Sequence, residues 1–103
     1  RESVSGLMDS ALPADEQALI LKVLQAYESE GVKYHALRTR QSGAMRFVSL
    51  HVLVPDEWTV RRGHRLLEEI EADIRQALPN TIIFTHLEAL NDLLSYDDIP
   101  LDR

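Results

Sequence analysis

The sequence predicts an α+β domain of two layers, in which two helices cover one face of a three-stranded sheet. In two segments, apolar residues recur every three or four positions, as they do along one face of an amphipathic helix. Further segments show β-branched, apolar and alternating patterns typical of strands. These segments follow in the order helix, strand, strand, helix, strand. A chain of 103 residues is long enough for one such domain and its core.

The first predicted helix begins at Pro13 and is stopped by Gly31. Proline suits the first helical position, and Asp15 and Glu16 place negative charge in the first turn, where the helix dipole favours it. Its apolar stripe consists of Leu19, Ile20, Val23, Leu24 and Tyr27. Such a stripe is typical of a core, so no chemistry is assigned to it. The preceding residues, 1–12, are predicted to be a lead-in without packed structure.

Two strands are predicted next, from Val32 to Gln41 and from Met45 to Val54, with a tight turn at Ser42-Gly43. Glycine supplies the positive φ that such turns favour. Alternation in the second strand directs one set of side chains towards the helices, namely Val48, Leu50, Val52 and Val54. The opposite face carries Phe47, Ser49, His51 and Leu53. This second face has apolar side chains and no helix to cover them, so we predict that it is a subunit interface.

The second helix is predicted from Val60 to Leu78, with Thr59 as its N-cap and Pro79-Asn80 as its stop. Its expected apolar stripe is Val60, Leu67, Ile70, Ile74, Ala77 and Leu78, and His64 falls within it. A third strand follows from Thr81 to Glu88. His86 and Glu88 are two positions apart in this strand, so they share a face. Residues 89–103 are predicted to be an acidic tail that begins with a short helical turn.

Four histidines and one carboxylate are the candidate functional residues: His35, His51, His64, His86 and Glu88. Imidazole and carboxylate groups are ligands that borderline divalent ions prefer, and zinc is favoured because it accepts both in a four-coordinate shell. Cobalt, cadmium, nickel, iron and manganese are the alternative ions. A ligating imidazole must be unprotonated, so metal affinity is expected to collapse below about pH 6.5, which is the pKa of a free histidine.

Each of these residues also has an ordinary structural interpretation. A single His-x-Glu pair on an exposed strand is common, and a histidine in a helix stripe is more often satisfied by a backbone carbonyl. It is their joint placement on a hairpin, a helix start and a strand that favours a metal site. Because His51 and His64 are expected on different sides of the sheet, we predict one of two arrangements. Either the helix starts at the sheet edge and His64 reaches around, or a second chain completes the coordination shell.

Composition and charge exclude several classes of function. Seventeen acidic against 11 basic side chains give a formal charge of −6, the wrong sign for a surface that follows nucleic-acid phosphates. Cysteine is absent, which removes both disulfides and thiolate ligands. No apolar run is long enough to span a membrane, and nothing resembles a signal peptide. We therefore expect cations, and not nucleic acid, as partners.

Two other functions remain open from the residues. A metal-assisted hydrolase needs a general base beside an open coordination position, and no second carboxylate or hydroxyl nucleophile stands at motif spacing, so we predict that the chain is not an enzyme. A small-molecule-sensing domain of similar topology that binds no metal is the alternative function. Only Gly43 and Gly63 lie near sites that such a ligand would use.

The element order is the ferredoxin-like pattern without its final strand, a topology that small metallochaperones also use. Several motifs carry a closer resemblance: Leu7-Met8-Asp9-Ser10-Ala11-Leu12-Pro13, His35-x-Leu37-Arg38-Thr39-Arg40-x-Ser42-Gly43, His51, His64, and His86-x-Glu88. Together they resemble the cytoplasmic carboxy-terminal domain of the cation diffusion facilitator family of divalent-metal transporters. That family implies an integral membrane antiporter that exchanges zinc or a related ion for protons. Six transmembrane helices of the same polypeptide would then precede Arg1.

The resemblance also implies roles for the parts of this chain. Residues 13–88 would be a homodimeric regulatory domain on the cytoplasmic side of the membrane, where bound metal stabilises the closed dimer and modulates efflux. The four histidines and Glu88 would be its metal positions, with a carboxylate able to bridge two ions. Residues 1–12 would be juxtamembrane, with Asp9 at an acidic family position. Two departures are Ala36 and Ala89, where many members have aspartate and proline; the first could remove an acceptor that orients His35.

Overall fold

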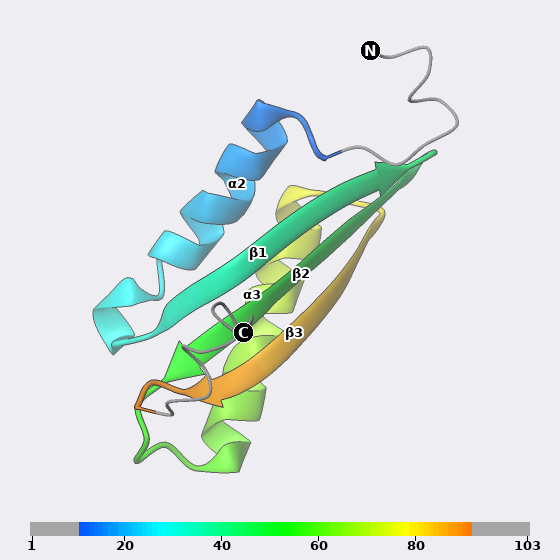
Figure 1. Ribbon diagram of the computed structural model, residues 1–103. Helices are drawn as coiled ribbons and strands as arrows, with labels where there is room; N and C mark the ends of the chain where they lie inside the picture. The colour runs from blue at the N-terminus through cyan, green and yellow to red at the C-terminus, as the bar shows by residue number, and fades with distance from the viewer. Residues whose placement is uncertain (1–10, 92–103) are drawn as a thin grey trace, which may run out of the picture.

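The computed structural model describes residues 11–91. Its elements are α2 (Ala14–Gln25), a short 3-10 helix η1 (Glu28–Glu30), β1 (Lys33–Ser42), β2 (Met45–Val54), α3 (Val60–Ala77) and β3 (Thr81–Ala89). The two α-helices lie on the same side of the three-stranded sheet (Figure 1). This confirms the α+β class and the predicted order of elements. The expectations for Asp9 and for most of the acidic tail fall outside the described residues.

The strands are ordered β1-β2-β3, so β2 is the central strand. β1 and β2 form an antiparallel hairpin in which Ser42 is paired with Met45. The turn therefore consists of Gly43 and Ala44, one position later than predicted, and Gly43 has the expected positive φ of 61°. β2 and β3 are parallel. A parallel pair requires a crossover connection, which α3 provides.

The core fills the space between the sheet and the helices. The predicted face of β2 supplies its centre, with Val48 and Val52 fully buried, and Ile20 and Leu24 contribute from α2. Leu12 also belongs to the core, being 2% exposed, and its backbone N–H donates to Oγ1 of Thr39 over 3.2 Å. The packed structure thus begins before Pro13, and the prediction that all of residues 1–12 are unpacked is wrong at Leu12.

The first helix is shorter than predicted. α2 ends at Gln25, and η1 carries the chain on to Gly31, whose φ of 83° ends the helical segment. Glycine adopts this left-handed conformation at little cost, which explains why the stop predicted at Gly31 holds although the regular helix ends earlier.

α3 begins as predicted but its buried stripe differs. Thr59 caps it by accepting a hydrogen bond at Oγ1 from the backbone N–H of Arg62 over 3.1 Å. Val60, however, is 81% exposed and His64 is exposed, whereas Gly63 is buried. The prediction that Val60 and His64 belong to the apolar stripe is wrong because the helix packs on the sheet through Gly63, a position without a side chain to mark it as apolar. None of the described helices is long and apolar enough to cross a membrane.

A β-bulge interrupts β1 between His35 and Arg38. Ala36, inside this interval, has a φ of 57°, which side chains rarely adopt. In a regular strand, residues three apart point to opposite faces. Here His35 is paired with His51 and Arg38 with Ser49, and these two partners share one face of β2. The bulge therefore places His35 on the face turned away from the helices.

Candidate metal centre

Three of the five predicted ligands converge at one place on the open face of the sheet. His35 comes from β1, His51 from β2 and Glu88 from β3, and one potential ligand atom from each lies within 4.8 Å of the others. The strand register explains the meeting, because His35 is directly opposite His51 on β1 and β2, while Glu88 is at the matching end of β3. We call His35, His51 and Glu88 the triad.

The carboxylate of Glu88 connects the two imidazoles. Its Oε1 lies 3.1 Å from Nε2 of His35, and its Oε2 lies 2.5 Å from Nδ1 of His51. The rings of His35 and His51 meet edge to face, with centroids 5.0 Å apart. The three side chains are between 21% and 28% exposed. The triad is thus sheltered by the sheet and still open to an ion from solvent.

The donor set fits a divalent ion. Two imidazole nitrogens and one carboxylate oxygen are the three protein ligands found in many open zinc sites, where a further position is left for another donor. The same atoms now contact each other as hydrogen-bonding partners, so the positions are set by the strands before any ion binds. A rigid scaffold of this kind lowers the cost of assembling the ligands.

His86 lies next to the triad without being a member of it. Its ring stacks on that of His51, with centroids 4.8 Å apart and planes 13° from parallel. The stack follows from the parallel register, which places His51 and His86 side by side. His86 is exposed, so it presents its ring at the surface beside Glu88. The prediction that His86 and Glu88 share a face of the strand agrees with this position.

His64 lies elsewhere. Its side chain is 67% exposed on α3, and Nδ1 is 3.7 Å from Oε2 of Glu68, one turn along the same helix. Among the described residues, the group able to hold a metal includes His35, His51 and Glu88 and leaves His64 out. The arrangement in which His64 reaches around the sheet edge within its own chain is therefore not the one that the described residues adopt.

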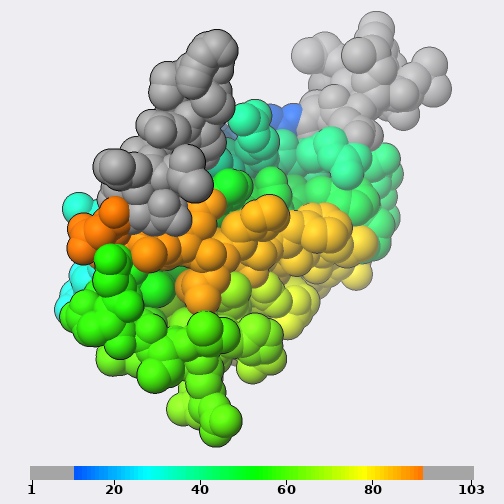
Figure 2. Space-filling view, turned by 60° about the horizontal axis from the view of Figure 1, so that its bottom comes forward, coloured from blue at the N-terminus to red at the C-terminus, as the bar shows by residue number. Residues whose placement is uncertain are grey.

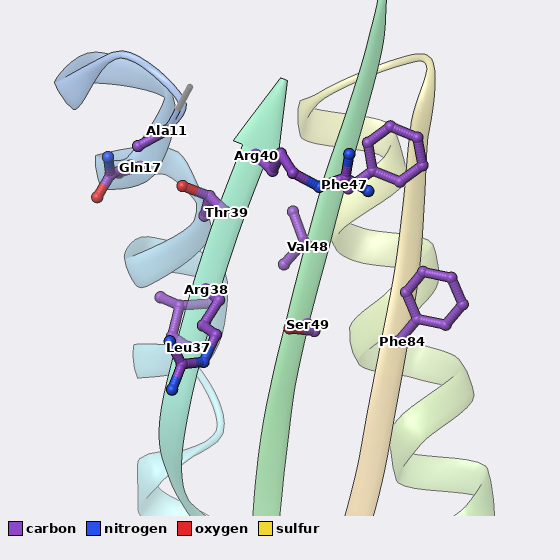
Figure 3. Close-up of a pocket in the computed structure, with 10 residues that line it drawn as sticks. All are labelled: Ala11, Gln17, Leu37, Arg38, Thr39, Arg40, Phe47, Val48, Ser49 and Phe84. Atoms are coloured by element: carbon purple, nitrogen blue, oxygen red, sulfur yellow. The ribbon is translucent and has the colours of Figure 1, made fainter. Parts of the chain in front are cut away.

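The open face continues from the triad towards the hairpin turn. Figure 3 shows the rings of Phe47 and Phe84 on this part of the sheet, with Arg40 reaching towards Phe47 and Arg38 further along β1; these residues line an open pocket of about 590 Å³. The guanidinium of Arg40 lies 4.1 Å from the ring centroid of Phe47. Phe84 is 57% exposed. An aromatic ring this exposed agrees with the predicted apolar character of the face.

Two features of the fold around this centre were missed by sequence reasoning. The bulge at Ala36 places His35 on the same face as His51, and α3 packs closely on Leu87 of β3 at Gly63. The only sequence signal for the second is a glycine inside a helical pattern, which is unfavourable there and so indicates a packing reason. The bulge has no signal of its own, because alanine is not typical of a positive φ.

The chain matches the family model described as the cytoplasmic domain of cation efflux proteins over residues 12–90. It is 45% identical over 97% of its length to an uncharacterised transporter of Synechocystis sp., covering 33% of that protein. It is 38% identical over 82% of its length to the cation-efflux pump FieF of Serratia proteamaculans, covering 28% of it. The chain thus spans about a third of the length of these relatives.

Solved structures share the fold. The zinc form of CzrB, a protein described as a zinc transporter, superimposes with a TM-score of 0.71 at 28% identity, covering 82% of this chain and 97% of that one. The metal-bound carboxy-terminal domain of CzcD from Thermotoga maritima gives 0.69 at 22% identity, covering 77% and 92%, and supports the fold alone. From the family model and the sequence identity, the chain belongs to the cytoplasmic domains of cation efflux proteins, the cation diffusion facilitator family that its motifs resemble.

Proposed function

We propose that this chain is the metal-binding regulatory domain of a divalent-cation efflux transporter, and that zinc binds at the triad of His35, His51 and Glu88. The observation that carries the proposal is the meeting of two imidazoles and a carboxylate from three different strands within 4.8 Å. The relatives support it, since FieF is named a cation-efflux pump and CzrB has a zinc form.

The chemistry of the ligands favours zinc. Nitrogen and oxygen donors without cysteine suit a borderline ion and accept zinc in a four-coordinate shell. Cobalt, nickel, cadmium, iron and manganese are the competing ions for the same donors. The triad leaves further coordination positions, for which His86 and His64 are the remaining imidazoles of the chain.

We propose that the remaining coordination positions are filled when two copies of the chain come together. His86 is exposed beside Glu88, and His64 is exposed on α3 where it cannot meet its own triad. In a homodimer whose contact joins the open face of one chain to the start of α3 of the other, His64 of the second copy supplies the missing imidazole, and Glu88 bridges two ions. The exposed rings and aliphatic side chains of the open face, Phe84 and Ile82, provide the apolar part of this contact.

Charge gives the ion its regulatory role. Each chain has a formal charge of −6, so two chains repel each other, and a divalent cation at their contact offsets part of that repulsion. Zinc then binds the closed pair more tightly than the separated chains, the condition for a ligand to shift a conformational equilibrium. In the complete transporter, which exchanges the ion for protons through its membrane part, closure would modulate efflux from the cytoplasmic side.

Calorimetric titration with zinc at pH 7.5 tests the triad. The wild-type chain is expected to bind zinc. His51→Ala and Glu88→Ala are each expected to weaken binding by about a hundredfold, since losing a ligand costs at least as much affinity as losing a residue that orients a ligand. Glu69→Ala, which removes an exposed carboxylate from α3, is the matched control and should bind like the wild type. Unchanged affinity in either triad variant would overturn the site. An absence of binding heat from the wild type would favour a small-molecule sensor that binds no metal.

Equilibrium sedimentation tests the dimer separately. With zinc, the association constant of the wild type is expected to rise, and His64→Ala should remove most of that rise while leaving the triad intact. Association that is indifferent both to zinc and to His64→Ala would contradict the shared site, whatever the calorimetry shows for one chain.

A further inference from the structure

Gly63 is a point of direct contact between α3 and β3. A Cβ atom at this position would lie 2.5 Å from Cδ2 of Leu87, and 3.2 and 3.3 Å from its Cδ1 and Cγ. Carbon atoms that are not bonded do not approach to 2.5 Å, so a side chain at position 63 would force the outer atoms of the Leu87 side chain to move. The start of α3 and the end of β3 lie against each other in the space-filling view (Figure 2).

Glycine at position 63 is unfavourable for the helix itself. Glycine in a helix interior is less favourable than alanine by about 0.5 to 1 kcal/mol, because its backbone loses more freedom on folding. Gly63 is the fourth residue of the 18-residue α3 and is buried. A buried helical glycine therefore needs a packing explanation, and the side chain of Leu87 supplies it. Leu87 in turn packs against the core.

Leu87 stands between two residues of the metal centre. His86 precedes it and Glu88 follows it, and both project to the opposite face of β3 from Leu87. Leu87 and Glu88 are adjacent in the strand, so a displacement that moves the backbone at Leu87 also moves Glu88. The two contacts of the Glu88 carboxylate, at 3.1 Å to His35 and 2.5 Å to His51, are both within hydrogen-bond range, so a shift of about 1 Å would break one of them.

We propose that Gly63 is a positioning residue for the metal centre: its missing side chain lets α3 hold Leu87, and through Leu87 the carboxylate of Glu88, where it reaches both imidazoles. This inference rests on the metal site proposed above. Gly63 touches no ligand atom and acts only through Leu87.

The test compares Gly63→Ala with the double variant Gly63→Ala/Leu87→Val, in which valine removes the terminal methyl groups that the new Cβ would meet. Zinc affinity is measured by calorimetry, and the coordination geometry by the visible absorption of the cobalt(II) form. Gly63→Ala is expected to weaken zinc binding about tenfold. This is the size of loss expected when a residue that orients a metal ligand, without touching the metal, is removed. The double variant is expected to recover most of that loss, with a cobalt spectrum like that of the wild type.

Gly43→Ala is the matched control. It is also a glycine-to-alanine change, and it is destabilising because Gly43 has a φ of 61°. Gly43 lies in the hairpin turn, at the other end of the strands from Glu88. Its zinc affinity should equal that of the wild type even where urea unfolding shows a lower stability. A loss of affinity in Gly43→Ala as large as in Gly63→Ala would overturn the inference, since any destabilisation would then do the same.

A readout on the metal-free protein separates this inference from the proposed function. The ring resonances of His35 and His51 in NMR spectra report their contacts with Glu88, and they are expected to move in Gly63→Ala and to return in the double variant. If the wild type binds no zinc, the metal site fails, and unchanged ring resonances in Gly63→Ala still overturn the positioning role. Should Gly63→Ala not fold, Leu87→Met, with a longer side chain facing position 63, is expected to produce the same displacement.

Discussion

The carboxylate of Glu88 lies 2.5 Å from Nδ1 of His51, although 37 positions separate the two residues in the chain. The contact arises because β2 and β3 are parallel neighbours, and their register pairs His86 with His51 and Glu88 with Leu53, at the carboxyl ends of both strands. Glu88 also reaches His35 on β1, the strand on the other side of β2. The central strand therefore organises the centre, with one ligand of its own and one from each neighbour.

Zinc should stabilise the fold if the triad binds it. A ligand that binds only the native state raises the free energy of unfolding by about 2.7 kcal/mol at a free concentration of a hundred times its Kd. Thermal unfolding at pH 7.5 is expected at a higher temperature with zinc than with a chelator. At pH 5 the shift should vanish, because protonated imidazoles do not bind metal. An equal shift at both pH values would contradict histidine ligation.

The bulge at Ala36 makes opposite predictions for two substitutions. Ala36 has a φ of 57°, where glycine is comfortable and a β-branched side chain is strained. Ala36→Gly is expected to leave the free energy of unfolding within about 1 kcal/mol of the wild type, while Ala36→Val lowers it by about 1 to 3 kcal/mol. Urea denaturation measures both. Because the bulge directs His35 to the triad, Ala36→Val should also weaken zinc binding, and equal stability of the two variants would show that the bulge carries no strain.

Tyr27 joins the end of α2 to α3. Its hydroxyl donates to Oδ2 of Asp73 over 2.6 Å, and burial, followed by this hydrogen bond, raises the pKa of Tyr27 well above its ordinary value of 10. The folded state thus holds the proton more tightly than the unfolded chain. The resulting stability is complete below about pH 10 and is lost as the pH rises towards the folded pKa.

Tyr27→Phe should therefore lower the free energy of unfolding by about 1 kcal/mol at pH 7. The deficit relative to the wild type is expected to shrink above pH 10, because the wild type loses stability there and phenylalanine does not titrate. Tyr34→Phe, on β1, is the control for removing a tyrosine hydroxyl. Chemical denaturation at pH 7, 9 and 11 provides the measurement, and a deficit that is constant over this range would exclude the linkage.

Arg46 connects three parts of the fold near the hairpin. Its Nε and Nη2 donate to the two carboxylate oxygens of Glu16 over 2.9 and 3.0 Å, and its Nη1 donates to the carbonyl of Pro79. The hydrogen bonds from Arg46 lower the pKa of Glu16 from its ordinary 4.5. A lowered folded pKa adds stability that is present above about pH 4.5 and is lost as the pH falls through the folded value.

Glu16→Gln is expected to be less stable than the wild type at pH 7, and the difference is expected to shrink as the pH falls below 4.5, because the wild type then loses the stability of the pair. Arg46→Lys should lose stability at pH 7 as well, because an ammonium group cannot reproduce the paired contact of a guanidinium with a carboxylate. Asp15→Asn, in the same turn of α2, is the control for a lost negative charge. A difference between Glu16→Gln and the wild type that stays constant as the pH is lowered from 7 through 4.5 and below would contradict the pairing.

Much of the fold could be predicted because its elements have regular periods. The alternation in β2 correctly separated the buried Val48 and Val52 from His51, and the two-residue spacing correctly put His86 and Glu88 on one face. Thr59 and Gly31 marked boundaries of elements, Thr59 through its side-chain hydroxyl and Gly31 through its positive φ. The position of His64 was misjudged, because the contact stripe of α3 begins at a glycine that carries no hydrophobic signal.

The sequence by itself determined the order of the elements, the face that each ligand-bearing strand residue would take in a regular strand, and the nitrogen and oxygen character of the centre. Only the tertiary structure decided which of those ligands meet. The bulge at Ala36 turns His35 to the side of His51, and the contact of Gly63 with Leu87 leaves His64 on the outside of α3. The physical reason is that side-chain periodicity encodes regular geometry, whereas a backbone irregularity and a close approach depend on atoms brought together from distant parts of the chain.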